Sequence, residues 1–397
     1  MPLHPAGSPS LLRAINERAI LQLFSAGRLL TRGDVATSSG LSKPTVSAAL
    51  THLVAGGLLA EAGQVTGRKG PAAQRYRLAS DAYLGVGVDI GRQSLRLGVV
   101  DAHGEQRIGL ADRTPDTVTG IATALGRLAD RAAAALGVPR TAFLRTVVGV
   151  PGAVDPQDQG VRYAGGLPEG GAGLAEALAA VFGDEVALEN DINLCAIVEG
   201  RAGAAAGMDD FVFLGLSSGI GMGIVLNGRL HRGATGAAGE IGFVPSPAHL
   251  LTGAPAAGRH PLVDDVVGTD RIREVARAHG LGDVEPPQVF DLARAGNAAA
   301  GAVVDDTCRT LAWIVATVLP VLDPELVVIG GPVGGNGDLL IEPVRRHLRA
   351  LTPLTPRVIA SGLGAQSVLL GALAVAEDLA RETAFALATA VAPPDVP

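Results

Sequence analysis

Leu84-Gly-Val-Gly-Val-Asp-Ile-Gly91 is the stretch that decides the fold of this 397-residue chain. Its large apolar side chains recur at every second position, which predicts a buried strand that ends at a glycine turn. Ser94-Leu-Arg-Leu-Gly-Val-Val100 predicts a second strand directly after that turn. The pattern returns at Phe211-Val-Phe-Leu-Gly-Leu216, with the turn Ser217-Ser-Gly-Ile-Gly221 and a strand over 222–226 behind it. We therefore predict an α/β protein built as two similar lobes.

Helices and further strands alternate around these two hairpins. The predicted helices cover 118–136, 173–182, 192–206, about 270–279 and 298–319, and the further predicted strands cover 145–150, 186–188 and 326–329. In such sheets ligands bind at the carboxyl ends of the strands, so polar residues at those ends are the candidates for a site.

Charge divides the chain near residue 80. Up to Ser80 there are nine Lys or Arg and three Asp or Glu, a net charge of +6, and both lysines of the protein, Lys43 and Lys69, lie there. From Asp81 on there are 23 basic and 36 acidic residues, a net charge of −13. A basic module joined to an acidic body predicts two tasks, one of them directed at a polyanion.

Length and composition bound the class of protein. A chain of 397 residues with 48% apolar residues has room for two or three cores. Cys195 and Cys308 both fall in apolar helical runs, so neither a disulfide framework nor a zinc quartet is visible. No secretory leader and no apolar run of membrane-spanning length are found. We therefore expect a soluble, cytoplasmic protein with no membrane partner.

Residues 1–80 are predicted to form a winged helix-turn-helix DNA-binding domain. A helix over 11–26 and a short helix from Thr31 precede a turn at 38–41, and Ser42 caps the next helix. Strands over 58–61 and 74–78 flank a basic loop that is typical of a wing. The residues expected to contact DNA lie on the capped helix and in this loop: Ser42, Lys43, Thr45, Ser47, Thr51, Arg68 and Lys69. The alternative is a helical protein-docking module with an incidental basic loop.

Four segments of the body carry its chemistry, and their order matches a known family. They are Val88-Asp-Ile-Gly91, Leu188-Glu-Asn-Asp-Ile-Asn193, Gly233-Ala-Thr-Gly-Ala-Ala-Gly-Glu-Ile-Gly242 and Leu322-Asp-Pro-Glu-Leu-Val-Val-Ile-Gly-Gly331. Behind the N-terminal module, this order closely resembles the transcription-factor branch of the ROK family (repressors, open reading frames, kinases). The resemblance implies an actin-like, hexokinase-like two-lobed ATPase fold with a sugar cleft, and a homodimer or homotetramer that binds operator DNA. We accordingly expect lobe 1 over 81–200, lobe 2 over 201–390 and a disordered tail over 391–397.

The expected sugar site combines residues of three segments. Asn190 and Asp191 stand between a predicted strand and a predicted helix, and Glu240 stands in a glycine-lined turn; adjacent sugar hydroxyls need such polar partners. The resemblance adds Asp264, in the place of a glutamate that contacts sugar in the family. It also implies that Asp191 is the catalytic base if the protein is a kinase, because the matching aspartate takes the proton from the hydroxyl being phosphorylated. The alternative is that Asp191 only caps the helix that follows it.

The phosphate-binding turns depart from the family pattern. If nucleotide binding were retained, the resemblance assigns it to Asp89, Gly91, Ser218, Gly219, Gly330 and Gly331. However, Arg92 and Gln93 stand where ROK kinases have a glycine and a threonine that approach phosphate. Met222 also replaces a glycine in the second turn. These changes argue against ATP and magnesium as cofactors.

The zinc loop of the family is also missing. Phe243 stands at the position of the family's histidine, and no cysteine lies between Cys195 and Cys308. His249 and His260 are nearby, but two lone histidines are more often solvated than bound to a metal. We therefore expect no metal site.

Three functions are compatible with this sequence. We favour a DNA-binding transcriptional regulator, a repressor of genes for sugar or amino-sugar metabolism, whose degenerate kinase-like body binds a sugar effector and thereby changes operator affinity. The second is an ATP-dependent sugar kinase with an accessory DNA-binding domain. The third is a sugar-binding regulator that acts through a protein partner.

Overall fold

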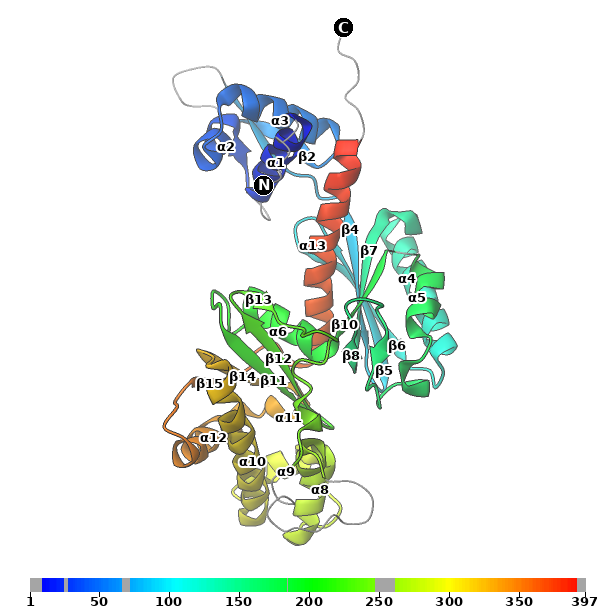
Figure 1. Ribbon diagram of the computed structural model, residues 1–397. Helices are drawn as coiled ribbons and strands as arrows, with labels where there is room; N and C mark the ends of the chain where they lie inside the picture. Colours follow the sequence, from blue (N-terminus) through cyan, green and yellow to red (C-terminus); the bar gives the residue numbers. More distant parts are fainter. Residues whose placement is uncertain (1–8, 25–27, 66–71, 184, 247–260, 391–397) are drawn as a thin grey trace, which may run out of the picture.

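The computed structural model describes residues 9–24, 28–65, 72–183, 185–246 and 261–390. These residues form an N-terminal module (9–78) and two larger lobes, which follow one another along the molecule in Figure 1. Arg68 and Lys69 of the expected wing, His249 and His260, and the tail 391–397 lie outside the described residues. Within the described part, no helix is both long enough and apolar enough to cross a bilayer.

The N-terminal module contains three helices and a small antiparallel sheet with the strand order β1-β3-β2. Its elements are α1 (Pro9–Gln22), β1 (Leu30–Thr31), α2 (Arg32–Ser39), α3 (Lys43–Ala55), β2 (Leu59–Val65) and β3 (Ala73–Leu78). Two local signals set the helix starts: Thr31 and Asp34 form a capping box on α2, and the Ser42 side chain accepts the Thr45 N–H at the start of α3. The predicted cap on α3 is thus confirmed.

One charged side chain is buried inside this module. Glu17 of α1 is 1% exposed, and its carboxylate lies 2.8 Å from Arg13 Nε and 3.0 Å from His52 Nδ1 of α3. A buried carboxylate needs such partners because its desolvation is costly. Glu17 therefore ties α1 to α3.

The two lobes carry sheets of the same topology, which confirms the predicted duplication. Lobe 1 has the strand order β10-β7-β4-β5-β6, and lobe 2 has the order β13-β12-β11-β14-β15. In each sheet the first strand pairs antiparallel with the second and parallel with the fourth. The strands of lobe 1 are β4 (Leu84–Ile90), β5 (Ser94–Asp101), β6 (Gln106–Arg113), β7 (Phe143–Val150) and β10 (Val186–Asn190). Those of lobe 2 are β11 (Phe211–Leu216), β12 (Ile220–Leu226), β13 (Arg229–Leu230), β14 (Leu326–Gly330) and β15 (Arg357–Ala360).

Helices cover both faces of the first sheet. One face carries α4 (Val118–Leu136) and α5 (Leu174–Phe182), whose apolar residues pack with Val86 and Val88 of β4. The other face carries α13 (Ser367–Ala390), toward which β4 presents Gly85 and Gly87. A Cβ added at Gly87 would lie 2.7 Å from the backbone nitrogen of Leu373. The glycine–valine alternation of β4 therefore lets α13 lie directly on the sheet.

Helix α13 connects all three parts of the molecule. It crosses α6 (Asp191–Ala202) so closely that a Cβ at Gly371 would lie 2.1 Å from the Leu194 carbonyl oxygen. Its C-terminal half enters the core of the N-terminal module through Ala384 and Phe385, and Figure 1 shows it reaching that module. The range 201–390 that we expected for lobe 2 therefore includes a helix that packs on lobe 1, because the chain returns to the first sheet at its end.

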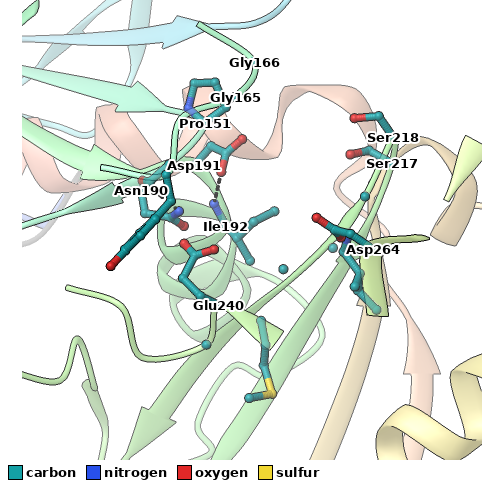
Figure 2. A pocket seen from close by; sticks show the side chains of 18 of the residues that line it. Pro151, Gly165, Gly166, Asn190, Asp191, Ile192, Ser217, Ser218, Glu240 and Asp264 are labelled. Atoms are coloured by element: carbon teal, nitrogen blue, oxygen red, sulfur yellow. Dashed lines mark hydrogen bonds between the residues drawn. The ribbon is translucent and has the colours of Figure 1, made fainter. Parts of the chain in front are cut away.

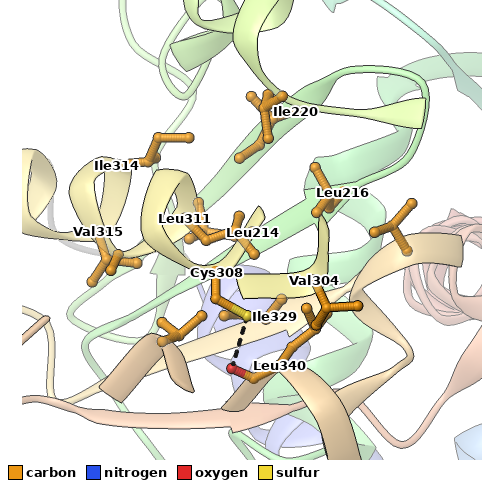
Figure 3. Packing of buried hydrophobic residues seen from close by; sticks show 14 of the residues in the cluster. Leu214, Leu216, Ile220, Val304, Cys308, Leu311, Ile314, Val315, Ile329 and Leu340 are labelled. Atoms are coloured by element: carbon orange, nitrogen blue, oxygen red, sulfur yellow. Dashed lines mark hydrogen bonds between the residues drawn. The ribbon is translucent and has the colours of Figure 1, made fainter. Parts of the chain in front are cut away.

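The core of lobe 2 lies between its sheet and a layer of helices. These are α8 (Thr269–Ala278), α9 (Pro286–Arg294), α10 (Ala298–Leu322) and α12 (Gly337–Leu351), with the short α11 (Gly331–Gly334) after β14. Figure 3 shows Leu214 and Ile329 of the sheet packed against Leu311 of α10. The buried thiol of Cys308 lies 3.7 Å from the Leu340 carbonyl oxygen of α12. Both cysteines are free and buried.

Candidate functional site

A cleft of about 460 Å³ lies between the two lobes. Lobe 1 contributes the end of β7, the segment 163–166 and the start of α6, and lobe 2 contributes the β11–β12 turn and the loop 238–243. Figure 2 shows Asn190, Asp191 and Glu240 together at one end of this cleft, and Ser217, Ser218 and Asp264 at the other. All four residues expected to bind sugar line it: Asn190, Asp191, Glu240 and Asp264.

Asn190 fixes the start of α6 and keeps part of its amide free. It is the N-cap, with its Oδ1 accepting the Asn193 N–H at 2.9 Å and its Nδ2 donating to the Gly152 carbonyl at 3.0 Å. An amide has two N–H donors and two acceptor lone pairs. One donor and one lone pair therefore remain for a ligand in the cleft.

Asp191 is the first residue of α6, so Asn190, not Asp191, caps this helix. One Asp191 oxygen accepts the Ile192 N–H at 2.8 Å. Burial, together with the charges of Asp89 and Glu240, raises the pKa of Asp191 to about 7. At neutral pH this carboxyl therefore changes readily between an acceptor and a donor of hydrogen bonds.

Glu240 enters the cleft from a loop in which the preceding position must be glycine. Gly239 has φ 90°, and a Cβ there would lie 1.8 Å from the Met222 carbonyl oxygen of β12. The Glu240 carboxylate makes no hydrogen bond to another residue of the described ranges. Burial and the neighbouring charge of Asp264 raise the pKa of Glu240. An unpaired acceptor of this kind suits the hydroxyls of a polar ligand.

Asp264 occupies a different place from the other three. Its Oδ1 accepts the Ile220 N–H at 2.9 Å, and Cβ atoms added at Gly219 and Gly242 would lie 2.7 and 2.6 Å from that oxygen. The carboxylate is therefore packed against the β11–β12 turn, beside residues to which the family resemblance assigned nucleotide binding, if it were retained. Spacing alone could not show this, because Asp264 reaches the turn from a distant segment.

An ion pair between the buried Glu189 and the partly exposed Arg232 supports the end of the cleft with Asn190, Asp191 and Glu240, and no sequence motif pointed to it. Glu189 accepts hydrogen bonds from the Asn193 side chain at 2.9 Å and from Arg232 Nε at 2.7 Å. Arg232 belongs to the loop that leads to Glu240, whereas Glu189 belongs to β10 of lobe 1. The pair therefore links the two lobes beside Asn190.

The residues assigned to the first phosphate turn lie beside the cleft and do not line it. Asp89 ends β4 and is 8% exposed; burial, opposed by Arg96, raises its pKa to about 6. Arg96 Nη1 lies 3.6 Å from Asp89 and donates to the Ala365 carbonyl at 2.5 Å, just before α13. Gly91 donates its N–H to the Ser94 carbonyl at 3.1 Å. Arg92, the next residue along, does line the cleft.

Of the other four residues expected to bind nucleotide, two line the cleft and two do not. Ser218 and Gly219 line the cleft, whereas Gly330 and Gly331 pack behind it. Gly331 has φ 85°, and a Cβ there would lie 2.6 Å from the Leu216 carbonyl oxygen at the end of β11. The structure therefore offers one glycine turn to a phosphate, and Asp264 already holds an N–H of that turn.

The zinc site that the family resemblance would bring is not formed by the residues that the structure describes. Among the described residues, no three His, Cys, Asp or Glu side chains come together to hold a metal ion. Phe243, at the position of the family's histidine, is 46% exposed and offers no ligand atom. The expected absence of zinc and of ATP stays a prediction.

The residues expected to contact DNA are accessible where the structure describes them. Ser42, Lys43 and Thr51 are exposed, and Thr45 and Ser47 are half-buried. The buried face of α3 consists of Val46, Ala49, Leu50 and Leu53. The opposite face of α3 is therefore open, with small polar side chains and one lysine.

Tyr163 and Phe243 are two cleft residues whose joint role the sequence did not reveal. Their ring centroids lie 5.3 Å apart with a tilt of 57° between the ring planes. Tyr163 follows β9 (Val161–Arg162) of lobe 1, and Phe243 ends the short helix Ile241–Phe243 of lobe 2. The rarity of tyrosine, with three in the whole chain, was the available signal for the first of them.

The known proteins that this chain resembles include both kinases and transcriptional regulators. The ROK family model matches residues 85–379. The chain is 27% identical to a glucokinase of Halalkalibacterium halodurans over 69% of this chain and 87% of that protein. It is 23% identical to a putative xylose repressor of Caldicellulosiruptor sp. over 93% of this chain and 97% of that protein. It is 37% identical to the bifunctional enzyme NanE/NanK of Brucella suis, of which it spans only 36%.

Solved structures extend the likeness to the N-terminal module. A ROK family transcriptional regulator, a homologue of the Escherichia coli MLC protein, superposes with a TM-score of 0.78 over 95% of this chain and 99% of the other, at 19% identity. A ROK family glucokinase from Streptomyces griseus in complex with glucose and AMPPNP gives a TM-score of 0.63 over 74% of this chain and 99% of the other, at 28% identity. The first of these is a likeness in fold.

Proposed function

The chain belongs to the ROK family, and from that premise we propose that it is a DNA-binding transcriptional regulator, a repressor of genes for sugar or amino-sugar metabolism. The cleft between the lobes binds a sugar effector, and the N-terminal module binds operator DNA. The putative xylose repressor and the glucokinases among its relatives support a sugar as the effector class.

Helix α3 is the element that enters the major groove. Its outer face presents Lys43, Thr45 and Thr51 next to a module whose sequence carries a net charge of +6. Small polar side chains read base edges, and basic side chains contact phosphates. A homodimer or homotetramer would place two such helices on a two-fold symmetric operator.

The effector site is the end of the cleft with Asn190, Asp191 and Glu240. Their free donor and acceptor positions converge from both lobes, so a sugar bound there contacts lobe 1 and lobe 2 together. A ligand changes a conformational equilibrium only when it binds one state better than the other. Contact with both lobes provides that preference, because lobe closure changes the contacts.

The observation that carries this proposal is the position of α13. Arg96 joins Asp89 beside the cleft to the carbonyl of Ala365 before α13, and Phe385 at the far end of α13 lies in the core of the N-terminal module. Arg18 of α1 also pairs with Glu382 of α13. One rigid helix thus contacts both the neighbourhood of the effector and the DNA-binding module.

The β11–β12 turn favours a binding protein over a kinase. The Asp264 carboxylate accepts the Ile220 N–H, and a nucleotide phosphate at this turn would meet that negative charge. Like charges at such a distance repel each other strongly when water is excluded. Arg92 and Gln93 in the first turn add bulk where phosphate would approach.

DNA selection from fragmented genomic DNA with the full chain tests this function. We expect salt-sensitive retention of specific fragments, weaker binding of all fragments by Lys43→Ala, and a changed sequence preference in Thr45→Ala. Asp191→Ala should retain DNA affinity and lose the response to sugars. Absence of any salt-sensitive DNA retention would refute the proposal and favour a regulator that acts through a protein partner.

A sugar kinase with an accessory DNA-binding domain is the second candidate. The observation in its favour is the Asp191 carboxyl, whose pKa near 7 suits a general base at neutral pH. ATP turnover assays with hexoses and amino sugars distinguish the two. Turnover that exceeds background and is lost in Asp191→Ala would establish the kinase; we expect none.

A further inference from the structure

Two aromatic rings stand exposed at the mouth of the cleft. Tyr163 is 62% exposed and Phe243 is 46% exposed, in a chain whose aromatic residues make up only 3%. The other two tyrosines, Tyr76 and Tyr83, are buried. Exposed large aromatics that gather at one place usually mark a binding surface.

The backbone at Tyr163 is held in an unfavourable conformation. Its φ is 58°, in the left-handed region that a bulky side chain rarely adopts. Such strain persists only where the surrounding structure holds it, and it gathers at ligand sites. Here it directs a ring of lobe 1 against Phe243 of lobe 2.

The wall of the cleft beside Tyr163 consists of glycines and therefore carries no side chains. Gly165 and Gly166 line the cleft there, a Cβ at Gly165 would meet no atom within 4 Å, and a Cβ at Gly166 would lie 3.7 Å from Arg92. Arg92 also lines the cleft, and it has no ion pair with another residue of the described ranges. This end of the cleft therefore has room for a further group, with a hydrogen-bond donor beside it.

We propose that Tyr163 and Phe243 form an aromatic subsite for the second ring of a glycoside, so that the effector is a sugar joined to another ring. This rests on the proposed function, because Asn190, Asp191 and Glu240 must hold the first ring. The two aromatic rings touch at a tilt of 57°, so each keeps an outer face on which a flat ring can stack. A second ring packed there contacts both lobes and favours one lobe arrangement.

Calorimetry of the full chain with matched methyl and phenyl glycosides of glucose, N-acetylglucosamine, mannose and xylose tests the proposal. We expect the phenyl glycoside of at least one pair to bind about threefold to tenfold more tightly than its methyl partner, the range that aromatic contacts supply. Disaccharides of the same sugars form a second arm. A preference shared by disaccharides identifies the second ring as a sugar, and one limited to phenyl glycosides identifies it as an aryl group; both support the subsite.

Two variants test the residues. Phe243→Ala and Tyr163→Asn should each abolish the preference for the second ring and leave the affinity for the methyl glycoside nearly unchanged. Asn accepts a left-handed φ, so Tyr163→Asn removes the ring without adding strain. Leu351→Ala, an exposed apolar residue at the end of α12, is the control and should keep the preference.

The outcomes separate this inference from the function on which it rests. Methyl glycosides that bind without any gain from a second ring, or a gain that survives both variants, would overturn the subsite alone. Failure of every methyl glycoside, phenyl glycoside and disaccharide to bind would overturn the sugar effector together with the subsite.

Discussion

Asp191→Asn is expected to stabilise the ligand-free protein at neutral and mildly alkaline pH. Burial first, and then the charges of Asp89 and Glu240, raise the pKa of Asp191 from 3.8 to about 7 in the folded protein. The folded state therefore binds a proton more tightly than the unfolded state. Protonated Asp191 therefore contributes to the free energy of unfolding. This contribution is present in full below pH 3.8 and is lost as the pH rises through about 7, where folded Asp191 ionises.

The size of the effect follows from that difference. The interval between 3.8 and about 7 corresponds to about 4 kcal/mol of destabilisation once Asp191 is ionised. Asp191 is only half-buried, so solvent screening reduces the expected gain on neutralisation to about 2 kcal/mol. The asparagine oxygen can still accept the Ile192 N–H, and no hydrogen bond of α6 is lost.

Urea unfolding of the wild type and of Asp191→Asn at about pH 8 and about pH 5 measures this gain. The variant should gain about 2 kcal/mol at the higher pH and less than half of that at the lower pH. Asp130→Asn is the control, because this carboxylate is 68% exposed and pairs with Arg140 at the surface. An equal gain at both pH values, or a variant less stable than wild type at pH 8, would refute the reasoning.

Four further substitutions, one of them a control, test the packing within and between the parts. Gly371→Ala should lower the free energy of unfolding by about 1–3 kcal/mol, because its Cβ would meet the backbone of α6; Gly301→Ala, which has open space in α10, should raise it by about 0.5–1 kcal/mol. Denaturant unfolding compares the two, and equal shifts would contradict the close helix crossing. Glu17→Ala should destabilise the N-terminal module by about 1–3 kcal/mol, because Arg13 and His52 lose the buried carboxylate that both of them contact; unchanged hydrogen exchange in α1 and α3 would contradict this. Phe385→Ala should keep the affinity of the cleft for glycosides and reduce the effect of a bound glycoside on DNA affinity, measured by fluorescence anisotropy; an undiminished effect would exclude α13 as the connection.

Local signals explain which parts of the fold the sequence predicted. Ser42 and Pro44 mark a helix start within a few residues, and the alternation of glycine and valine in 84–90 marks a strand that is buried on both faces. The place of α13 could not be predicted in this way. Its own sequence is apolar on several sides, and its contact with β4 depends on residues almost 290 positions away.

In the candidate site, too, the sequence could predict residues that are close along the chain, but not contacts between distant segments. Asn190 and Asp191 are adjacent, and a glycine turn identifies Glu240, so the sequence could propose these three together. Asp264 was grouped with them by resemblance, yet it lies on the β11–β12 turn because the fold returns a distant segment there. The contact of Tyr163 with Phe243 joins two lobes, and no spacing within either segment encodes it.

The most direct test of the proposed function measures the linkage between binding in the cleft and DNA binding by the N-terminal module. A DNA fragment selected with the full chain is titrated with protein in the absence and in the presence of a saturating glycoside, and the glycoside is titrated with and without that fragment. We expect the glycoside to weaken DNA binding by about fivefold or more, DNA to weaken glycoside binding by the same factor, and Asp191→Asn to remove both effects. DNA affinity that stays unchanged at saturating glycoside would contradict the proposed function.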